Sequence, residues 1–80
     1  MNAVDLPSGE RASNKADLII VRPTLRGGYE FSAVLPTVGV ITMHNPNGVL
    51  YPSTDEAKAA GIKWADSRGV QQLWVEYAEA

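Results

Sequence analysis

The middle of the chain is almost free of charge, and this feature restricts the fold more than any other. Between Gly27 and Thr54 the only charged residue is Glu30, although turn and alternation signals predict two or three β-strands there. A helix of about fifteen residues, roughly 22 Å long and roughly 10 Å wide, covers one face of such a sheet. Apolar residues at both strand parities nevertheless predict apolar side chains on both faces: Val34, Val38, Val40, Ile41, Met43, Val49 and Leu50. The second face must therefore meet water, a partner or another copy of the chain.

Strands are predicted on both sides of a glycine turn at residues 27–28. Before the turn, residues 18–21 are apolar and largely β-branched, which is typical of an interior strand. After it, residues 29–35 alternate in polarity and give the strongest strand pattern in the chain. A β-rich run at residues 38–44 and a short hairpin partner at residues 49–51 complete the central strands.

A capping box opens the one predicted helix. The Ser53 hydroxyl can accept a hydrogen bond from the Glu56 backbone N–H, while the Glu56 carboxylate can accept one from the Ser53 N–H. Gly69 is well placed as a left-handed C-terminal cap, so the helix is predicted over residues 54–68. Small residues and one tryptophan follow helical spacing and predict a face that lies close to the sheet: Ala57, Ala60, Gly61, Trp64 and Ala65.

Together these elements predict an α+β fold. We expect an antiparallel sheet of four or five strands with one helix packed on one face, in the order β-β-β-(β)-α-β. Residues 1–16 lack regular periodicity after Leu6 and are expected to form a flexible N-terminal arm, with residues 17–80 as a single domain. The chain has no cysteine, no secretory signal pattern and no long apolar run, which predicts a cytoplasmic protein.

The last predicted strand, residues 70–77, supplies the candidate anchor of a partner surface. Trp74 has the parity opposite to Leu73 and Val75, so it is expected to project onto the face that the helix leaves uncovered. A large aromatic residue in such a place is typical of a binding anchor. Sheet curvature that buries it and self-association through the same face are the alternatives. The predicted protein-binding residues are Trp74, Gln72, Glu76, Val34 and Glu30.

His44 is the only histidine and the only obvious acid–base candidate. No G-x-S-x-G nucleophile elbow accompanies it, and no set of ligands has the spacing of a zinc site. Asp55 and Glu56 are adjacent carboxylates, but their place in the first turn of the helix accounts for both. The sequence therefore predicts a protein that is not an enzyme and that uses neither a metal ion nor a cofactor.

A small group of basic residues supports an alternative function. Arg22 and Arg26 flank the glycine turn and, with Lys15 and Arg11, are the candidate residues of a nucleic-acid-binding domain. Seven Lys and Arg against nine Asp and Glu give a net charge of -2, which argues against binding mainly through phosphate neutralisation. Affinity that falls steeply with salt would distinguish this function from apolar docking.

The order of motifs also bears on function. The chain has, in order, a strand, the turn Gly27-Gly28-Tyr29, a strand that ends in Leu35-Pro36, and a helix that starts at Ser53-Thr54-Asp55-Glu56-Ala57. This order resembles in outline the HicB-like antitoxin domain, whose small sheet docks a toxin. The stretch between Pro36 and Thr54 is several residues longer than that family's pattern. In size and style the chain is also similar to phage-encoded accessory proteins, including anti-CRISPR inhibitors. These resemblances imply an inhibitor or regulator of a larger protein or complex, which agrees with a protein-interaction module.

Overall fold

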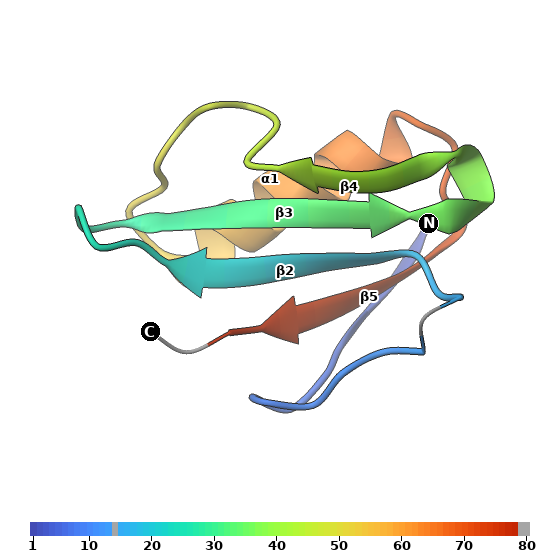
Figure 1. Cartoon of the computed structure of the whole chain (residues 1–80), viewed down its shortest axis with the longest axis horizontal. Helices are drawn as coiled ribbons and strands as arrows, with labels where there is room; N and C mark the ends of the chain where they lie inside the picture. The colour runs from blue at the N-terminus through green and yellow to red at the C-terminus, as the bar shows by residue number, and fades with distance from the viewer. Residues whose placement is uncertain (14, 79–80) are drawn as a thin grey trace.

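The computed structural model describes residues 1–13 and 15–78, and of Ile41 the backbone alone. Its elements are β1 (Asn2–Asp5), β2 (Leu18–Pro23), β3 (Tyr29–Leu35), the 3-10 helix η1 (Pro36–Val38), β4 (Val40–His44), α1 (Thr54–Asp66) and β5 (Gln72–Tyr77). The strands form one five-stranded sheet in the order β1-β5-β2-β3-β4, and α1 packs behind it (Figure 1). The predicted α+β class with a single helix is confirmed.

The sheet is mixed, so the prediction of an antiparallel sheet is wrong in part. β3 runs antiparallel to β2 and β4, whereas β1 and β2 both run parallel to β5. β4 therefore has the same direction as β5, and the connection between them through α1 is a parallel crossover. The physical reason is that a helix returns the chain along the length of the strand it follows, so the next strand starts from the same end.

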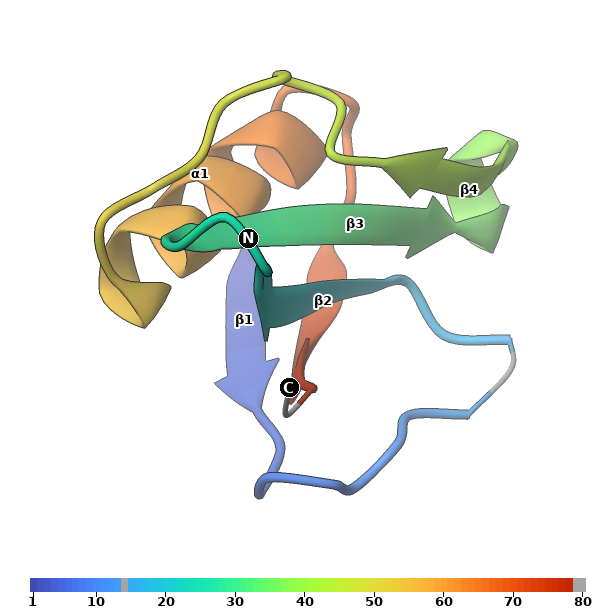
Figure 2. The same cartoon turned by 60° about the vertical axis from the view of Figure 1, so that its left-hand side comes forward.

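The N-terminal residues supply an edge strand that corrects the expected element order. β1 pairs in parallel with β5, with Asn2 opposite Gln72 and Asp5 opposite Val75. Four residues carry too little alternation to be recognised as a strand, and the partner that holds them lies at the other end of the sequence. The arm expected over residues 1–16 thus begins as a strand, and the chain then loops round to β2 (Figure 2). Asn14, within that arm, lies outside the described residues.

The core lies between α1 and the sheet face that the helix covers. Phe31 and Leu35 of β3 are fully buried, as the alternation of this strand predicts. Gly61 permits the close approach of helix and sheet, because a Cβ atom there would lie 2.5 Å from Ile19 Cδ1 and 3.2 Å from the Phe31 ring. The other fully or nearly fully buried apolar residues are Ile19, Val21, Ala33, Ala57, Ala65, Val70, Leu73 and Val75.

Both ends of α1 follow the sequence signals closely. The Glu56 N–H donates to Ser53 Oγ at 3.2 Å, as the capping box predicts. At the other end the N–H groups of Gly69 and Val70 donate to the carbonyl oxygens of Asp66 and Ala65, at 3.0 and 3.3 Å. With Gly69 at φ +85°, this is a left-handed glycine cap, and the helix proper ends at Asp66, two residues before the predicted end.

The strand predicted at residues 49–51 is reduced to a single bridge. Tyr51 exchanges two backbone hydrogen bonds of 2.8 Å with Tyr29, and no further pairing is formed by this segment in the described part of the chain. Pro52 follows at once and lacks the N–H that a continuing ladder needs. The chain between β4 and α1 is therefore a long loop that touches the sheet at one point.

Asp5 joins the edge strand β1 to the helix and to β5. Lys58 Nζ donates to Asp5 Oδ2 at 2.8 Å, and the Tyr77 hydroxyl donates to Asp5 Oδ1 at 3.0 Å. The hydrogen bond from Lys58 holds the pKa of Asp5 below its usual value, and the same bond raises the pKa of Lys58. Burial, followed by the bond to Asp5, raises the pKa of Tyr77.

Asp5→Asn is expected to lower the free energy of unfolding by about 0.5 kcal/mol near neutral pH, the value typical of an exposed ion pair. Because the folded pKa of Asp5 lies below the unfolded value, this stabilisation is present above about pH 3.9 and is lost as the pH falls through the folded pKa. The raised pKa of Lys58 means that it is also lost as the pH rises beyond about 10.4. Urea denaturation of both proteins across this range tests the prediction, and a difference that does not vary with pH would contradict it.

Candidate functional site

The face of the sheet opposite α1, here called the open face, carries two rows of aligned side chains. Val34, Leu18, Trp74 and Val4 are consecutive partners across β3, β2, β5 and β1. His44, Ser32, Ile20 and Glu76 form the next row, across β4, β3, β2 and β5. All five predicted protein-binding residues lie on this face: Trp74, Gln72, Glu76, Val34 and Glu30.

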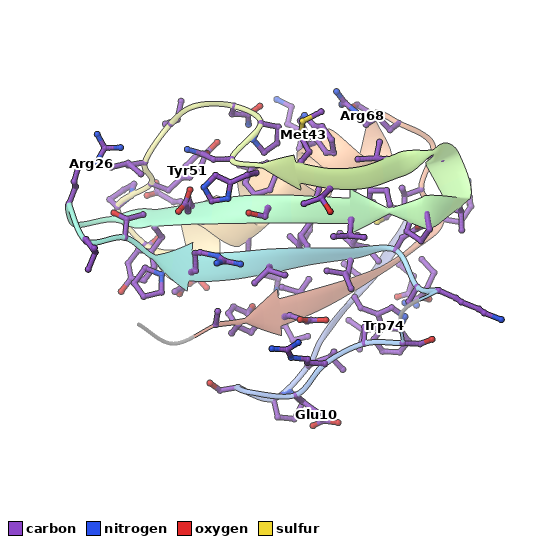
Figure 3. All side chains as sticks on the ribbon, in the orientation of Figure 1. Glu10, Arg26, Met43, Tyr51, Arg68 and Trp74 are labelled. Carbon is purple, nitrogen blue, oxygen red and sulfur yellow. The ribbon has the colours of Figure 1, made fainter. Side chains whose placement is uncertain are left out.

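Residues 6–13 and 15–17 lie over the open face and shelter the end of it that carries Trp74; they are called the crossing segment. The Ala12 N–H donates to Glu76 Oε2 at 2.9 Å, and the Trp74 N–H donates to the Asp17 carbonyl oxygen at 3.0 Å. Lys15 and Trp74 line one cleft, and Trp74 lies beside the segment that leads into β2 (Figure 3). Trp74 is half-buried and Glu76 is 9% exposed. Part of the apolar surface for which the sequence predicts a partner is therefore sheltered by the chain itself.

The same segment is fixed to the sheet by a buried carboxylate that sequence patterns do not reveal. Asp17 is 6% exposed, and its carboxylate accepts hydrogen bonds from the backbone N–H and the hydroxyl of Thr37 in η1. These charge-assisted bonds satisfy the buried charge. Asp17 and Thr37 lie far apart in the sequence, so only the pairing of β2 with β3 brings them together.

His44 has two polar partners on the open face. Its Nδ1 lies 3.0 Å from Ser32 Oγ, and its Nε2 lies 3.2 Å from Glu30 Oε2. In the tautomer with its hydrogen on Nε2, the ring donates to Glu30 and accepts from Ser32. This resembles the Ser-His-Asp relay of serine hydrolases, except that the serine and the carboxylate have exchanged ring nitrogens. Ser32 is only 4% exposed, however, so its hydroxyl lies too deep to meet a substrate. The arrangement instead braces β4 against β3, and it follows from the register that places His44 opposite Ser32.

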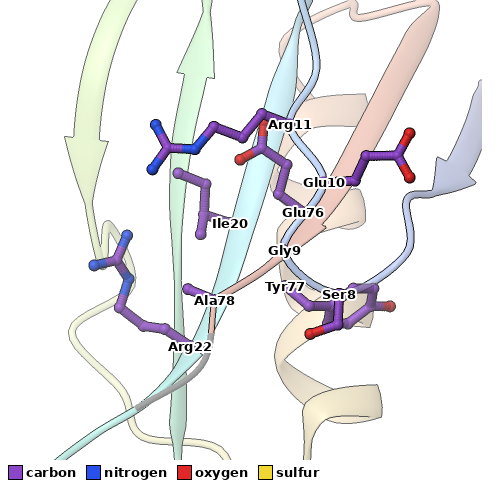
Figure 4. A pocket seen from close by; sticks show the side chains of 9 residues that line it. All are labelled: Ser8, Gly9, Glu10, Arg11, Ile20, Arg22, Glu76, Tyr77 and Ala78. Atoms are coloured by element: carbon purple, nitrogen blue, oxygen red, sulfur yellow. The ribbon is translucent and has the colours of Figure 1, made fainter.

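A groove of about 640 Å³ separates residues 8–11 from the open face. The side chains of Arg11 and Arg22 extend to the same side of this groove, with Ile20 between them (Figure 4). Arg22 Nε is buried, and no described group accepts its hydrogen. Arg26 and Lys15 line two other clefts, so the four candidate nucleic-acid-binding residues do not share one cleft.

Most of the exposed large apolar side chains lie near the β4 edge of the sheet, whereas Met1, which is 45% exposed, directly precedes β1 at the other edge. β4 is one of the two edge strands and, among the described residues, pairs with β3 alone. Met43 within it is 43% exposed, and Val38 just before it is 37% exposed. Val49 and Leu50 in the following loop are exposed, and Leu25 in the β2–β3 turn shares a cleft with Leu50. Of the other apolar residues that sequence placed on two faces, Val34 and Val40 are partly buried, and the side chain of Ile41 lies outside the described residues.

The described residues carry neither a cluster of metal ligands nor a helix that could span a membrane. Residues 1–13 and 15–78 contain no group of three or more His, Cys, Asp or Glu side chains that is arranged to hold a metal ion. Within the same residues, α1 is neither long enough nor apolar enough to cross a membrane, and no other α-helix is present.

No protein-family model, curated protein or solved structure matches the chain. Its function must therefore be inferred from its own surface.

Proposed function

We propose that this chain is a non-enzymatic protein-interaction module, an inhibitor or regulator of a larger protein, which binds an extended segment of that protein along β4. The observation that carries the proposal is an uncharged edge strand bordered by exposed apolar side chains. An extended segment that adds to a sheet edge gains main-chain hydrogen bonds, and its alternate side chains gain specificity from the surface beside the edge.

β4 lacks the side chains that usually protect a sheet edge. Edge strands are commonly kept from pairing by lysine, by other charges or by proline. β4 has the sequence Val-Ile-Thr-Met-His and contains none of these. Its one protective feature is a register shift opposite residues 33–35 of β3, which limits the length of strand that a partner can add. A short apolar segment of a partner is thus the expected ligand.

The predicted protein-binding residues divide into two groups under this proposal. Glu76 binds Ala12, Gln72 accepts a hydrogen bond of 2.8 Å from the Asn2 side chain, and Trp74 lies against the crossing segment. These three residues serve to hold the chain's own N-terminal part. Val34 and Glu30 lie on β3, the strand next to β4, and are the members of the set that we propose to contact the partner.

Met43→Lys is expected to weaken binding of an extended peptide at least about tenfold, because it places a charge on the apolar edge where the partner packs. The control variant is Ala59→Lys, which adds the same charge at an exposed position of α1 and so reports any general effect of that charge on folding or binding. Peptides selected on the wild-type protein from a random display library are the probes, with affinities measured by titration for all three proteins. Amide hydrogen exchange should show protection in β4 when peptide is bound.

Two outcomes would overturn the β4 proposal. Equal loss of affinity in Met43→Lys and Ala59→Lys would assign the effect to charge alone. Protection confined to β1 and β5 would place the interface at the other edge. Sedimentation tests whether a second copy of the chain occupies this edge. A wild-type dimer that Met43→Lys converts to a monomer would mean that β4 pairs with that copy and not with a different protein.

A further inference from the structure

We infer that the groove between residues 8–11 and the open face binds the carboxylate of an acidic peptide side chain through Arg22 and Arg11. The groove is lined by β2 and β5, and β3 separates it from β4. This inference therefore concerns a second site and does not depend on peptide binding at the β4 edge.

Arg22 provides the strongest argument for an anionic ligand. Its Nε–H group is buried without an acceptor among the described residues, and a buried donor that lacks a partner is costly. The acid directly opposite it in the β2–β3 ladder, Glu30, is engaged with His44 instead. A carboxylate in the groove would supply the missing acceptor and form charge-assisted bonds with the planar guanidinium group.

Arg11 adds a second cation on the same side of the groove. Neither Arg11 nor Arg22 forms an ion pair with another described residue, and Figure 4 shows both side chains on the side away from Glu10. Ile20 lies between them and offers an apolar floor for the aliphatic stem of a ligand. The combination of two guanidinium groups and a half-buried isoleucine fits a glutamate or aspartate side chain.

The charge of the whole groove favours a peptide over a nucleic acid. Glu10 and Glu76 also line it and balance the two arginines, so it offers no continuous positive track for a phosphate backbone. The chain as a whole carries a net charge of -2, which adds to the repulsion of a polyanion. A single carboxylate on a neutral backbone meets the arginines without this cost.

The test is a titration with a capped, alanine-rich peptide that carries a single glutamate, followed by NMR of the Arg22 Nε–Hε signal and the Ile20 methyl groups. We expect saturable shifts of both with this peptide and none with the matched glutamine peptide. Arg22→Lys keeps the charge but loses the Nε–H group and the fork, so affinity should fall about tenfold. Arg26→Lys, at the β2–β3 turn outside the groove, is the matched control and should leave affinity unchanged.

Several results would overturn this assignment. Equal binding of the glutamine peptide would show that the carboxylate is not recognised and would rule out an acidic ligand. Equal losses of affinity for the glutamate peptide in Arg22→Lys and Arg26→Lys would show that the groove does not recognise the carboxylate through Arg22 in particular. Tighter binding of single-stranded oligo-dT, or of inorganic phosphate, than of the glutamate peptide would assign the groove to a phosphate ligand. Met43→Lys should leave these shifts unchanged, which separates this test from that of β4.

Discussion

Phe31→Ala should lower the free energy of unfolding by about 3–5 kcal/mol, the range found when a buried phenylalanine is truncated. Phe31 is fully buried at the centre of the helix–sheet contact, with its ring centroid 6.3 Å from that of Tyr51 and 6.4 Å from that of Trp64. Its removal leaves a cavity beneath Gly61, which has no side chain to fill it. Urea denaturation followed by circular dichroism measures the change.

Two controls bear on the interpretation of Phe31→Ala. Phe31→Leu keeps most of the buried volume and should cost only about 1 kcal/mol. Val38→Ala removes an apolar side chain that is 37% exposed and should change stability by no more than about 0.5 kcal/mol. A small protein has roughly 5 kcal/mol of stability in total, so Phe31→Ala is expected to retain only about 0–2 kcal/mol and to unfold at a much lower urea concentration than wild type. A loss below that of Phe31→Leu would contradict the packing described for α1 and β3.

Trp74→Ala should lower the free energy of unfolding by about 2 kcal/mol, less than truncation of a fully buried aromatic residue because part of the indole is exposed. Trp74 stands in register between Val4 of β1 and Leu18 of β2 and beside residues 15–17 of the crossing segment. Its loss should loosen both β1 and that segment. Urea denaturation gives the stability, and amide hydrogen exchange over residues 2–17 gives the local effect.

The result for Trp74→Ala decides between two roles for the residue. Gln72→Ala, on the same face of β5, is the control, because it removes one exposed hydrogen bond to Asn2 and no large buried surface, and it should leave stability within about 0.5 kcal/mol of wild type. If Trp74→Ala folds as stably as wild type but no longer binds peptide, Trp74 is an anchor for a partner. If it loses stability and exchange protection near the N-terminus, Trp74 is an anchor for the chain itself, as its contacts with the crossing segment indicate.

The proposed sites place two different chemistries on one small sheet. β4 offers unprotected backbone and apolar side chains at one edge, whereas the groove beside β2 and β5 offers arginine side chains near the other. A partner with an apolar extended segment and a nearby acidic residue would use both. Binding that is weakened separately by Met43→Lys and by Arg22→Lys, with additive losses in the double variant, is the pattern expected of two distant contacts.

Local sequence signals were sufficient for the elements whose stability depends on neighbouring residues. Strand β3 has the predicted bounds, because its alternation reports directly which side chains face the core. α1 starts after Ser53 and is closed by Gly69, because capping chemistry acts within a single turn of helix. The face of small residues on α1 was also evident, and Gly61 shows why it is needed.

The candidate sites depended on contacts between distant parts of the chain, and sequence patterns could not supply them. β1 exists as a strand because it pairs with β5, some seventy residues away, as the Asn2–Gln72 side-chain bond illustrates. His44 finds Ser32 and Glu30 only through the register of β3 and β4, and Arg22 faces a groove only because residues 8–11 return over the sheet. Sequence alone determined that α1, β2, β3, β4 and β5 would form, since the preferences of those segments are local, whereas β1 required its distant partner. The tertiary structure alone decided which apolar side chains remain exposed, because that depends on where the rest of the chain folds.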